Sequence, residues 1–393
     1  MTVGATSAGP LTGPLIAGRY ALGAPLGSGG AAVVWQAWDT RAGRAVALKA
    51  GRVVEMDGGE ADVGSVQGLD YAMIVPPERT VGPVTLATLR WRLQREEQVM
   101  SLLAHPNIAR VYEYLEADGR PWLALELVEG LDLRHVTRER GPLSILAALD
   151  VGRQMCAALA ALHGAGVIHR DVKPQNIILS SNGHATLIDF DLAWTPTLRD
   201  AGEPDMVYGT PEYMAPEQAM GERVTTATDL YALGVTLYEL LAGSAPFHSG
   251  RASAIMWRHV AETPPPLREW RQDLPAPVER VVMRALAKEP RRRYPSAEAM
   301  EQALARAQDA ARLAPANADR RIVALPAQVS RTVETAPPAP FVVGPAPAPV
   351  LPAASPTDYA PAGWLIMAYW ALAVIGVVLT LILLSALAEH LPA

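Results

Sequence analysis

Hydrophobic and polar positions along the chain follow two different periods, and each period predicts a type of element. Residues Arg44 to Lys49 alternate in polarity, which favours a half-buried strand, and strands are also expected from Tyr20 and around Trp122. Apolar residues recur at helical spacing over two longer stretches, about Leu86 to Ala104 and Ser144 to Gly164. The second of these helices ends at a glycine, which is a common stop signal. The chain therefore combines strands with helices.

The end of the chain has a different pattern. Residues 313–362 are dominated by proline and alanine, which predicts a disordered, extended linker without a core. Residues 363–388 carry no charge, and about 25 helical residues span roughly 37 Å, more than the ~30 Å hydrocarbon core of a bilayer. Aromatic residues crowd the first part of this segment, as in an interfacial belt. A buried core helix is the alternative, but the linker offers no core, so we expect a single transmembrane helix and a short tail at 389–393.

Residues 1–18 and the overall composition limit the setting in which the chain works. Residues 1–18 lack a basic segment, and glycine and proline interrupt their apolar positions, so we expect a disordered tail rather than a signal peptide. The net charge of -6, without a basic cluster, argues against a nucleic-acid partner. The single cysteine, Cys156, falls in an Ala/Leu-rich helical pattern, which predicts a buried, inert thiol.

Candidate chemistry concentrates in one short polar segment between the apolar pairs at 167–168 and 177–178. This segment places Asp171, Lys173 and Asn176 at fixed offsets. A carboxylate can accept a proton from a hydroxyl, an ammonium can neutralise a transferring phosphoryl group, and an amide oxygen can bind a hard metal ion. The pattern predicts a rigid loop whose side chains point into a cleft.

The segment from His169 to Asn176 resembles the catalytic loop of protein kinases, and the other motifs of that family follow in order over residues 19–312. Lys173 and Thr210 match the serine/threonine version, and the bacterial eukaryotic-like (Hanks-type) serine/threonine protein kinases are the most similar branch. The resemblance implies an α+β, bilobal protein-kinase fold, followed by the disordered linker and the single transmembrane helix. The small lobe would span 19–127, with an insertion at about 51–84, and the large lobe 128–312.

The resemblance implies an ATP site between the lobes. Lys49 would orient the α- and β-phosphates and pair with Glu96, which lies on the apolar stripe of its helix, while Glu97 is the solvated alternative. The glycine-rich loop is a partial match, because Ala32 stands at its third glycine position. The full set implied for ATP is Leu26, Gly27, Ser28, Gly29, Gly30, Val34, Ala47, Lys49, Glu96, Glu126, Val128 and Ile178.

The same resemblance assigns metal-binding and catalytic roles. Asn176 and Asp189 would hold Mg²⁺, with Mn²⁺ as the alternative ion. Asp171 would accept the proton of the substrate hydroxyl, and Lys173 would neutralise the γ-phosphoryl group. Asp191 replaces the glycine of the family's Asp-Phe-Gly segment, which raises the question of how freely that segment can flip, because aspartate tolerates positive φ less well than glycine.

Three further residues match structural positions of the family. Glu217 would be buried and paired with Arg293, as a bidentate structural pair. Asp229 would steady the catalytic loop from below and also cap its own helix as the N-cap residue. Both assignments concern rigidity rather than chemistry.

Arg170 matches the arginine that often pairs with a phosphorylated residue in this family. Near Gly209 this chain has Glu203 and Asp205 in place of a threonine, while Thr195 and Thr197 lie earlier. We therefore hypothesise that Asp205 or Glu203 supplies a standing negative charge to Arg170.

The function implied is that of a membrane-tethered serine/threonine protein kinase, which transfers the ATP γ-phosphoryl group to protein Ser/Thr hydroxyls, its own included. Its partners would be ATP, protein substrates and the lipid bilayer, without nucleic acid, and a homodimer is left open. The kinase domain would face the cytoplasm at the cell membrane. The alternative is a pseudokinase scaffold that binds nucleotide or partner proteins without efficient turnover. Ala32, Asp191 and the insertion slightly favour this alternative.

Overall fold

The computed structural model describes the chain in seven parts, which are residues 2–3, 11, 13–28, 32–51, 85–195, 209–249 and 251–313. All of them lie within one compact unit, Met1–Thr332. Several sequence predictions fall outside the described residues, namely those on Gly29, Gly30, Asp205, the insertion (apart from Gly51), the linker beyond Leu313, the transmembrane helix at 363–388 and the tail at 389–393.

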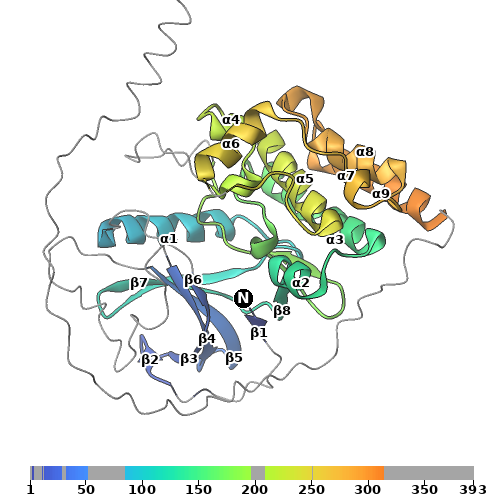
Figure 1. Ribbon diagram of the computed structural model, residues 1–393. Helices are drawn as coiled ribbons and strands as arrows, with labels where there is room; N and C mark the ends of the chain where they lie inside the picture. The colour runs from blue at the N-terminus through green and yellow to red at the C-terminus, as the bar shows by residue number, and fades with distance from the viewer. Residues whose placement is uncertain are drawn as a thin grey trace, which may run out of the picture. The chain divides into compact units, whose positions relative to one another are not determined.

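The first half of the described chain forms an antiparallel six-stranded sheet with one helix, α1 (Leu86–Ser101), packed against two of its strands (Figure 1). Alternation along the strands buries one set of side chains, and the two largest of these, Trp35 and Trp122, fill a core of their own. The strand order is β2 (Leu15–Ile16), β3 (Tyr20–Ser28), β4 (Ala32–Asp39), β5 (Arg44–Gly51), β7 (Arg120–Glu126) and β6 (Val111–Ala117).

The expectation of disorder is wrong for the described part of the N-terminal tail. Strand β2 pairs with β3, and Ile16 is only 1% exposed within the small-lobe core. Strand β1 (Thr2–Val3) pairs with β8 (Gly130–Asp132). Two-residue strands leave no readable period, so the sequence pattern could not reveal them; they form because a neighbouring strand offers a backbone edge.

Helix α1 begins at an N-cap, Thr85, whose hydroxyl accepts the amide of Thr88 at 3.1 Å. The helix ends at Ser101, slightly before the expected end at Ala104. Its buried side includes Leu93, Glu96 and Met100, so the apolar stripe faces the interior with one carboxylate on it.

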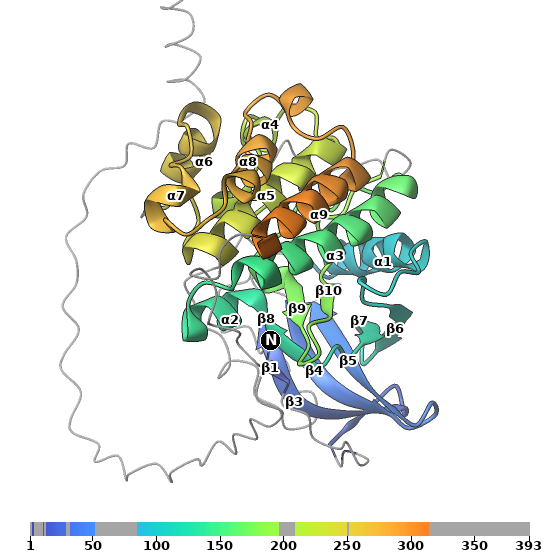
Figure 2. The same ribbon diagram turned by 90° about the vertical axis from the view of Figure 1, so that its right-hand side faces the viewer.

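The second half is mainly helical, and a small sheet of β1, β8, β9 (Ile177–Leu179) and β10 (Ala185–Leu187) lies on the side of its helices toward the six-stranded sheet (Figure 2). Short 3-10 turns are η3 (Pro174–Asn176), η4 (Pro211–Tyr213) and η5 (Pro290–Arg292). The helices are α2 (Leu133–Arg140), α3 (Ile145–Gly164), α4 (Pro216–Ala219), α5 (Thr226–Ala242), α6 (Ala252–Ala261), α7 (Leu267–Trp270), α8 (Ala276–Ala285) and α9 (Ala297–Leu313).

Helix α3 is central to the large-lobe core. Ser144 caps its start, and it packs against α5 and α9 (Figure 2). Within the described residues it is the one helix long and apolar enough to cross a membrane, but its apolar side chains belong to this core. Cys156 on α3 is fully buried, and burial raises the pKa of its thiol, as expected for an inert cysteine.

Candidate active site

Lys49 and Glu96 meet in the interior between β5 and α1. The Lys49 ammonium lies 2.9 and 2.8 Å from the two carboxylate oxygens of Glu96, which is 1% exposed. The amide of Phe190 also donates to Glu96, at 3.2 Å. Burial raises the pKa of Glu96 to about 7, against the opposing influence of Lys49. Burial alone would lower the pKa of Lys49, but the nearby carboxylates outweigh it and hold that pKa above its ordinary value.

The structure separates the two adjacent glutamates of α1. Glu96 lies on the buried face and contacts Lys49, whereas Glu97 lies on the more exposed side and accepts the hydroxyl of Ser101 at 3.0 Å. The difference follows from the helical period, since consecutive residues point about 100° apart. The apolar stripe in the sequence therefore identified the correct carboxylate for Lys49.

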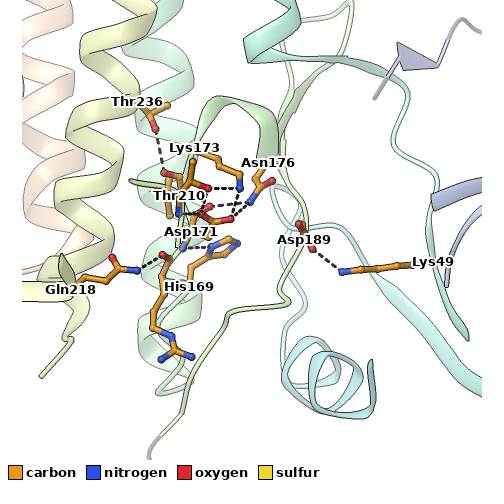
Figure 3. A network of polar contacts seen from close by, with 11 residues as sticks. Lys49, His169, Asp171, Lys173, Asn176, Asp189, Thr210, Gln218 and Thr236 are labelled. Carbon is orange, nitrogen blue, oxygen red and sulfur yellow. Dashed lines mark hydrogen bonds and ion pairs between the residues drawn. The ribbon is translucent and has the colours of Figure 1, made fainter. Parts of the chain in front are cut away.

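Asp189 is the third member of this group, with its carboxylate 2.7 Å from the Lys49 ammonium (Figure 3). Desolvation acts to raise the pKa of Asp189, but Lys49 prevails and holds it below the usual range. The side chain remains 39% exposed, so Asp189 can meet a ligand while it contacts Lys49. Its backbone has φ 65, a left-handed conformation that costs a non-glycine residue roughly 1–2 kcal/mol.

Asp191 is not under this strain. Among the described non-glycine residues, positive φ occurs at Ala17, Asp118, Arg170 and Asp189, and Asp191 is not one of them. The observed conformation of the segment therefore does not require glycine at position 191. The residue with the left-handed backbone is Asp189, whose carboxylate contacts Lys49.

The catalytic-loop residues form a second cluster on the large lobe (Figure 3). Lys173 donates to Asp171 at 2.5 Å and to the hydroxyl of Thr210 at 2.7 Å, and this hydroxyl lies 2.9 Å from the other oxygen of Asp171. The amide nitrogen of Asn176 contacts the backbone carbonyl and carboxylate of Asp171, at 2.9 and 3.2 Å. Asp171 is thereby held by a cation, a hydroxyl and an amide, so its orientation is fixed before any ligand binds.

Asn176 suits a metal ligand because of how its side chain is oriented. Its side-chain nitrogen contacts Asp171, and its oxygen points to the side on which Asp189 lies (Figure 3). An amide oxygen and a carboxylate are ligands that a hard divalent cation accepts. The arrangement of Asn176 and Asp189 therefore fits Mg²⁺ or Mn²⁺.

Asp229 anchors the catalytic loop from α5. Its carboxylate accepts the amides of His169 and Arg170 at 2.9 and 2.8 Å, and it also contacts the ring of His163 at 2.9 Å. Desolvation acts to raise the pKa of Asp229, but these hydrogen bonds lower it below the ordinary value. The expectation that Asp229 is an N-cap is wrong, because Thr225 caps α5 in a capping box and Asp229 lies one turn inside the helix.

Arg170 has the same left-handed backbone as Asp189, with φ 65. Its guanidinium donates to the carbonyl of Leu192 at 2.7 Å, which ties the catalytic loop to the segment after Asp191. Arg95 of α1 acts in parallel, because its guanidinium donates to the next carbonyl, that of Ala193, at 2.6 Å. The proposed pairing of Arg170 with Asp205 or Glu203 stays a prediction, because both acids lie outside the described residues.

Glu217 and Arg293 form a closed ion pair below the active site. Two parallel contacts of 2.7 Å join the guanidinium to the carboxylate, and Thr228 donates to the same carboxylate at 2.8 Å. Tyr231 lies against the guanidinium, 4.8 Å away. This bidentate pair secures α4 to the segment around η5.

The side chains expected to enclose an adenine ring come from both lobes. Val34, Ala47 and Ile178 are all buried, and Leu26, Gly27 and Ser28 lie on β3. At the expected hinge, the amide of Glu126 already donates to the carbonyl of Arg110 at 2.8 Å. An adenine ring would therefore use the carbonyl of Glu126 and, two residues later, the amide of Val128.

Two residues that contact this site were not identified from the sequence, Arg95 and Gln218. Gln218 on α4 donates from its side-chain amide to the carbonyl of Arg170 at 2.9 Å (Figure 3). Side-chain hydrogen bonds to a distant backbone carbonyl leave no periodic signal, so only the spatial arrangement reveals them. The available hint was that each residue directly adjoins a predicted one, Glu96 or Glu217.

Comparisons with known proteins agree with this geometry. The protein kinase domain family matches residues 85–305. The chain is 34% identical over 303 residues to the serine/threonine-protein kinase PrkC of Bacillus subtilis, covering 77% of this chain and 42% of that protein. It is 35% identical over 292 residues to PknA of Mycobacterium tuberculosis, covering 73% and 61%, and 35% identical over 300 residues to pkn3 of Myxococcus xanthus, covering 74% and 50%.

The aligned region thus spans between 42% and 61% of the length of these relatives. The family match includes all of α1, the catalytic loop and the helices of the large lobe up to the middle of α9. Together with the order of the motifs, these matches show that the chain belongs to the protein kinase family, in its bacterial Hanks-type serine/threonine branch.

Proposed function

We propose that this chain is a membrane-tethered serine/threonine protein kinase, which transfers the γ-phosphoryl group of ATP to hydroxyls of proteins, its own included. The observation that carries the proposal is that Lys49 contacts Glu96 and Asp189 at the same time. This three-way contact needs α1, β5 and the segment of Asp189 to be close together, which is the arrangement that phosphoryl transfer requires.

The nucleotide would bind against the small lobe. Lys49, held by Glu96, orients the α- and β-phosphates, while Val34, Ala47 and Ile178 enclose the adenine ring. The backbone of β3 from Leu26 through Ser28, continued by Gly29 and Gly30, covers the phosphates, since glycine permits close approach of backbone amides.

Asn176 and Asp189 would hold the divalent cation, Mg²⁺ or Mn²⁺, which supplies positive charge beside the phosphates when it is bound. Lys49 remains in contact with Asp189 and so fixes the orientation of that ligand. Asn176 is oriented by Asp171, which couples the metal side of the site to the catalytic carboxylate.

Transfer would proceed at Asp171. The carboxylate orients a Ser or Thr hydroxyl and accepts its proton, the hydroxyl oxygen bonds to the γ-phosphorus, and the bond to the β–γ bridging oxygen breaks to release ADP. Lys173 neutralises charge on the transferring group. Thr210 contacts both side chains and so keeps their separation fixed.

Replacement of the catalytic carboxylate tests the proposal. Asp171→Asn should lower phosphate transfer to a generic substrate protein by about 10²–10⁴-fold, with ATP affinity largely retained, because an amide cannot accept the proton. Asp150→Asn, at an exposed carboxylate on α3, is the matched control and should leave turnover unchanged. Retention of full transfer by Asp171→Asn would refute the assignment.

The pseudokinase alternative is not favoured, because Lys49, Glu96, Asp171, Asn176 and Asp189 are all present and the observed contacts join them. It makes a distinct prediction, since a scaffold would bind Mg·ATP without transfer in both the wild-type chain and Asp171→Asn. Phosphate transfer by the wild-type chain but not by Asp171→Asn would exclude the scaffold function.

The membrane tether and the domain limits are part of the proposal. The kinase domain would span 19–312, with the linker at 313–362 and a transmembrane helix at 363–388 that leaves the kinase domain in the cytoplasm, where ATP is available. The uncharged run of 363–388 supports this part. A chain truncated after residue 362 should lose membrane association in cell fractionation and keep its kinase activity, and continued sedimentation with membranes would overturn the tether.

We also propose that Asp205 or Glu203 supplies the negative charge that pairs with Arg170. Basal activity then needs no phosphorylation of the loop. Thr195, one of the two earlier threonines, is buried, which makes it a poor target for modification. Unphosphorylated protein should therefore be active, and an Asp205→Ala, Glu203→Ala double variant should lose activity. Protein that stays inactive until Thr195 or Thr197 is phosphorylated would contradict this mechanism.

A further inference from the structure

Arg170 is held at three points, two on its backbone and one on its side chain. Its amide donates to Asp229 at 2.8 Å, its carbonyl accepts Gln218 at 2.9 Å, and its guanidinium donates to Leu192 at 2.7 Å. Arg170 is left-handed with φ 65, and the next residue is Asp171. Since the peptide plane between these two residues includes the Arg170 carbonyl, whatever fixes that carbonyl also sets the direction in which Asp171 leaves the loop.

Gln218 is itself fixed from the other side. It follows Glu217, whose carboxylate is locked by Arg293, and its side chain is buried at 6% exposure. In Figure 3 the Gln218 amide approaches the loop from the side opposite to Asp189 and Lys49. The closed ion pair of Glu217 and Arg293 therefore has a direct connection to the catalytic loop, and Gln218 provides it.

The same amide also lies close to Gly209, the residue before Thr210. A Cβ placed on Gly209 would lie 2.7 Å from the side-chain nitrogen of Gln218, and Gly209 has φ 132. Glycine at this position lets the backbone pass directly over the amide. Gln218 thus bonds the residue before Asp171 and lies close to the residue before Thr210. The side chains of Asp171 and Thr210 are themselves 2.9 Å apart.

We propose that Gln218 is a positioning residue for phosphoryl transfer. It fixes the left-handed backbone of Arg170 relative to the backbone at Gly209. Asp171 and Thr210, which follow these two residues, are thereby kept within hydrogen-bonding distance of each other. The inference rests on the proposed kinase function and deepens it by connecting α4 to the reacting carboxylate. A purely structural glutamine would stabilise the fold and leave the turnover of folded protein unchanged.

Two substitutions at this position separate these roles. Gln218→Met keeps the length and bulk of the side chain but removes the donor, and Gln218→Glu places an acceptor against the Arg170 carbonyl. Gln308→Met is the matched control, because Gln308 is also buried, at 3% exposure, and bonds Arg153 at 3.0 Å, far along the chain on α9. Both Met variants remove hydrogen bonding from a buried glutamine side chain.

Gln218→Met should lower kcat by about tenfold to a hundredfold, because a small misalignment of a reacting group has effects of that size. KM for ATP should stay within about twofold, since Lys49 and Glu96 are untouched. Gln218→Glu should lower kcat at least as far. Gln308→Met should match Gln218→Met in Tm and keep the kcat of the wild-type chain. Equal kcat for the two Met variants would overturn the inference.

Amide hydrogen exchange provides a readout that needs no turnover. The peptide covering residues 167–172 should exchange faster in Gln218→Met than in the wild-type chain, and Gln308→Met should not change it. Unchanged exchange in Gln218→Met would contradict the proposed role. If the wild-type chain transfers no phosphate, the proposed function fails by itself, and the exchange measurement still decides whether Gln218 positions the loop.

Discussion

Two buried Lys/Arg–Glu ion pairs among the described residues have similar composition and different surroundings. Lys49 and Glu96 join the small-lobe sheet to α1, and Arg293 and Glu217 join η5 to α4. Both carboxylates are buried, and both cations approach them closely. Removing two charges from water costs much of what their attraction returns, so neither pair can be explained by attraction alone.

The difference lies in how completely each cation is used. All five N–H donors of the Arg293 guanidinium form hydrogen bonds. The acceptors are the carboxylate of Glu217 and the carbonyls of Ala227, Ala287 and Lys288. Lys49 shares its ammonium with Asp189, which is partly exposed. A pair closed on all sides fixes structure, whereas a pair open on one side keeps a charge available for a ligand.

Breaking the closed pair should give the largest effect. Arg293→Met leaves Glu217 buried without its cation, and the free energy of unfolding should fall by about 3–5 kcal/mol, measured by urea denaturation. The double variant Arg293→Met, Glu217→Leu removes the stranded charge and should recover part of this loss. A double variant less stable than the single one would show that the pair's charges are not the cause.

Breaking the open pair should affect turnover more than stability. Glu96→Gln weakens the hold on Lys49, and kcat/KM should fall by about a hundredfold, since the phosphates are no longer oriented. Lys49 keeps Asp189 as a partner, so the fold should lose less stability than in Arg293→Met. Glu97→Gln is the adjacent control on α1 and should leave both quantities unchanged; a similar loss in this variant would reassign the pair.

The pH dependence of the unfolding free energy tests the role of His259, which contacts the same Tyr231 that lies against Arg293 of the closed pair. This buried ring contacts the hydroxyl of Tyr231 and the carbonyl of Glu212, and burial lowers its pKa to about 4, aided by the charge of Lys288. The unfolded chain, with a pKa near 6.5, then binds a proton that the folded chain refuses. Stability from His259 is therefore complete above pH 6.5 and decreases as pH falls toward 4.

The expected slope is up to about 1.4 kcal/mol of unfolding free energy per pH unit in that window. His259→Gln removes this titration, so its urea midpoint should depend less on pH between 6.5 and about 4 than that of the wild-type chain. His248→Gln, at an exposed histidine, is the control. Parallel pH curves for wild type and His259→Gln would rule out this contribution.

The smallest effect is expected at Asp191, beside the open pair. Because Asp191 does not adopt positive φ here, glycine would relieve no strain and would add freedom to the unfolded chain. Asp191→Gly should lower the free energy of unfolding by about 0.5–1 kcal/mol, with kcat within about twofold of wild type. A clear gain in stability on thermal unfolding would show that position 191 is strained after all.

Local patterns in the sequence predicted several helices and the burial of particular residues on them. Helical spacing placed Glu96 on the buried stripe and predicted α3 and the buried Cys156, because a residue's face on a helix depends only on the helical period. The capping interpretation of Asp229 failed for the complementary reason. Aspartate near the start of a helix is a preferred N-cap residue. The carboxylate of Asp229 instead accepts hydrogen bonds from two amides of the catalytic loop, about 60 residues away along the chain.

The sequence by itself determined which residue types the site contains and in what order, because the chemistry of a carboxylate, an ammonium or an amide belongs to the residue. Only the tertiary structure decided how they are held. The left-handed backbones of Arg170 and Asp189, the closed contacts of Arg293 and the reach of Gln218 all depend on segments distant in the chain. Such contacts form when packing overrides local preference, and no periodic pattern records them.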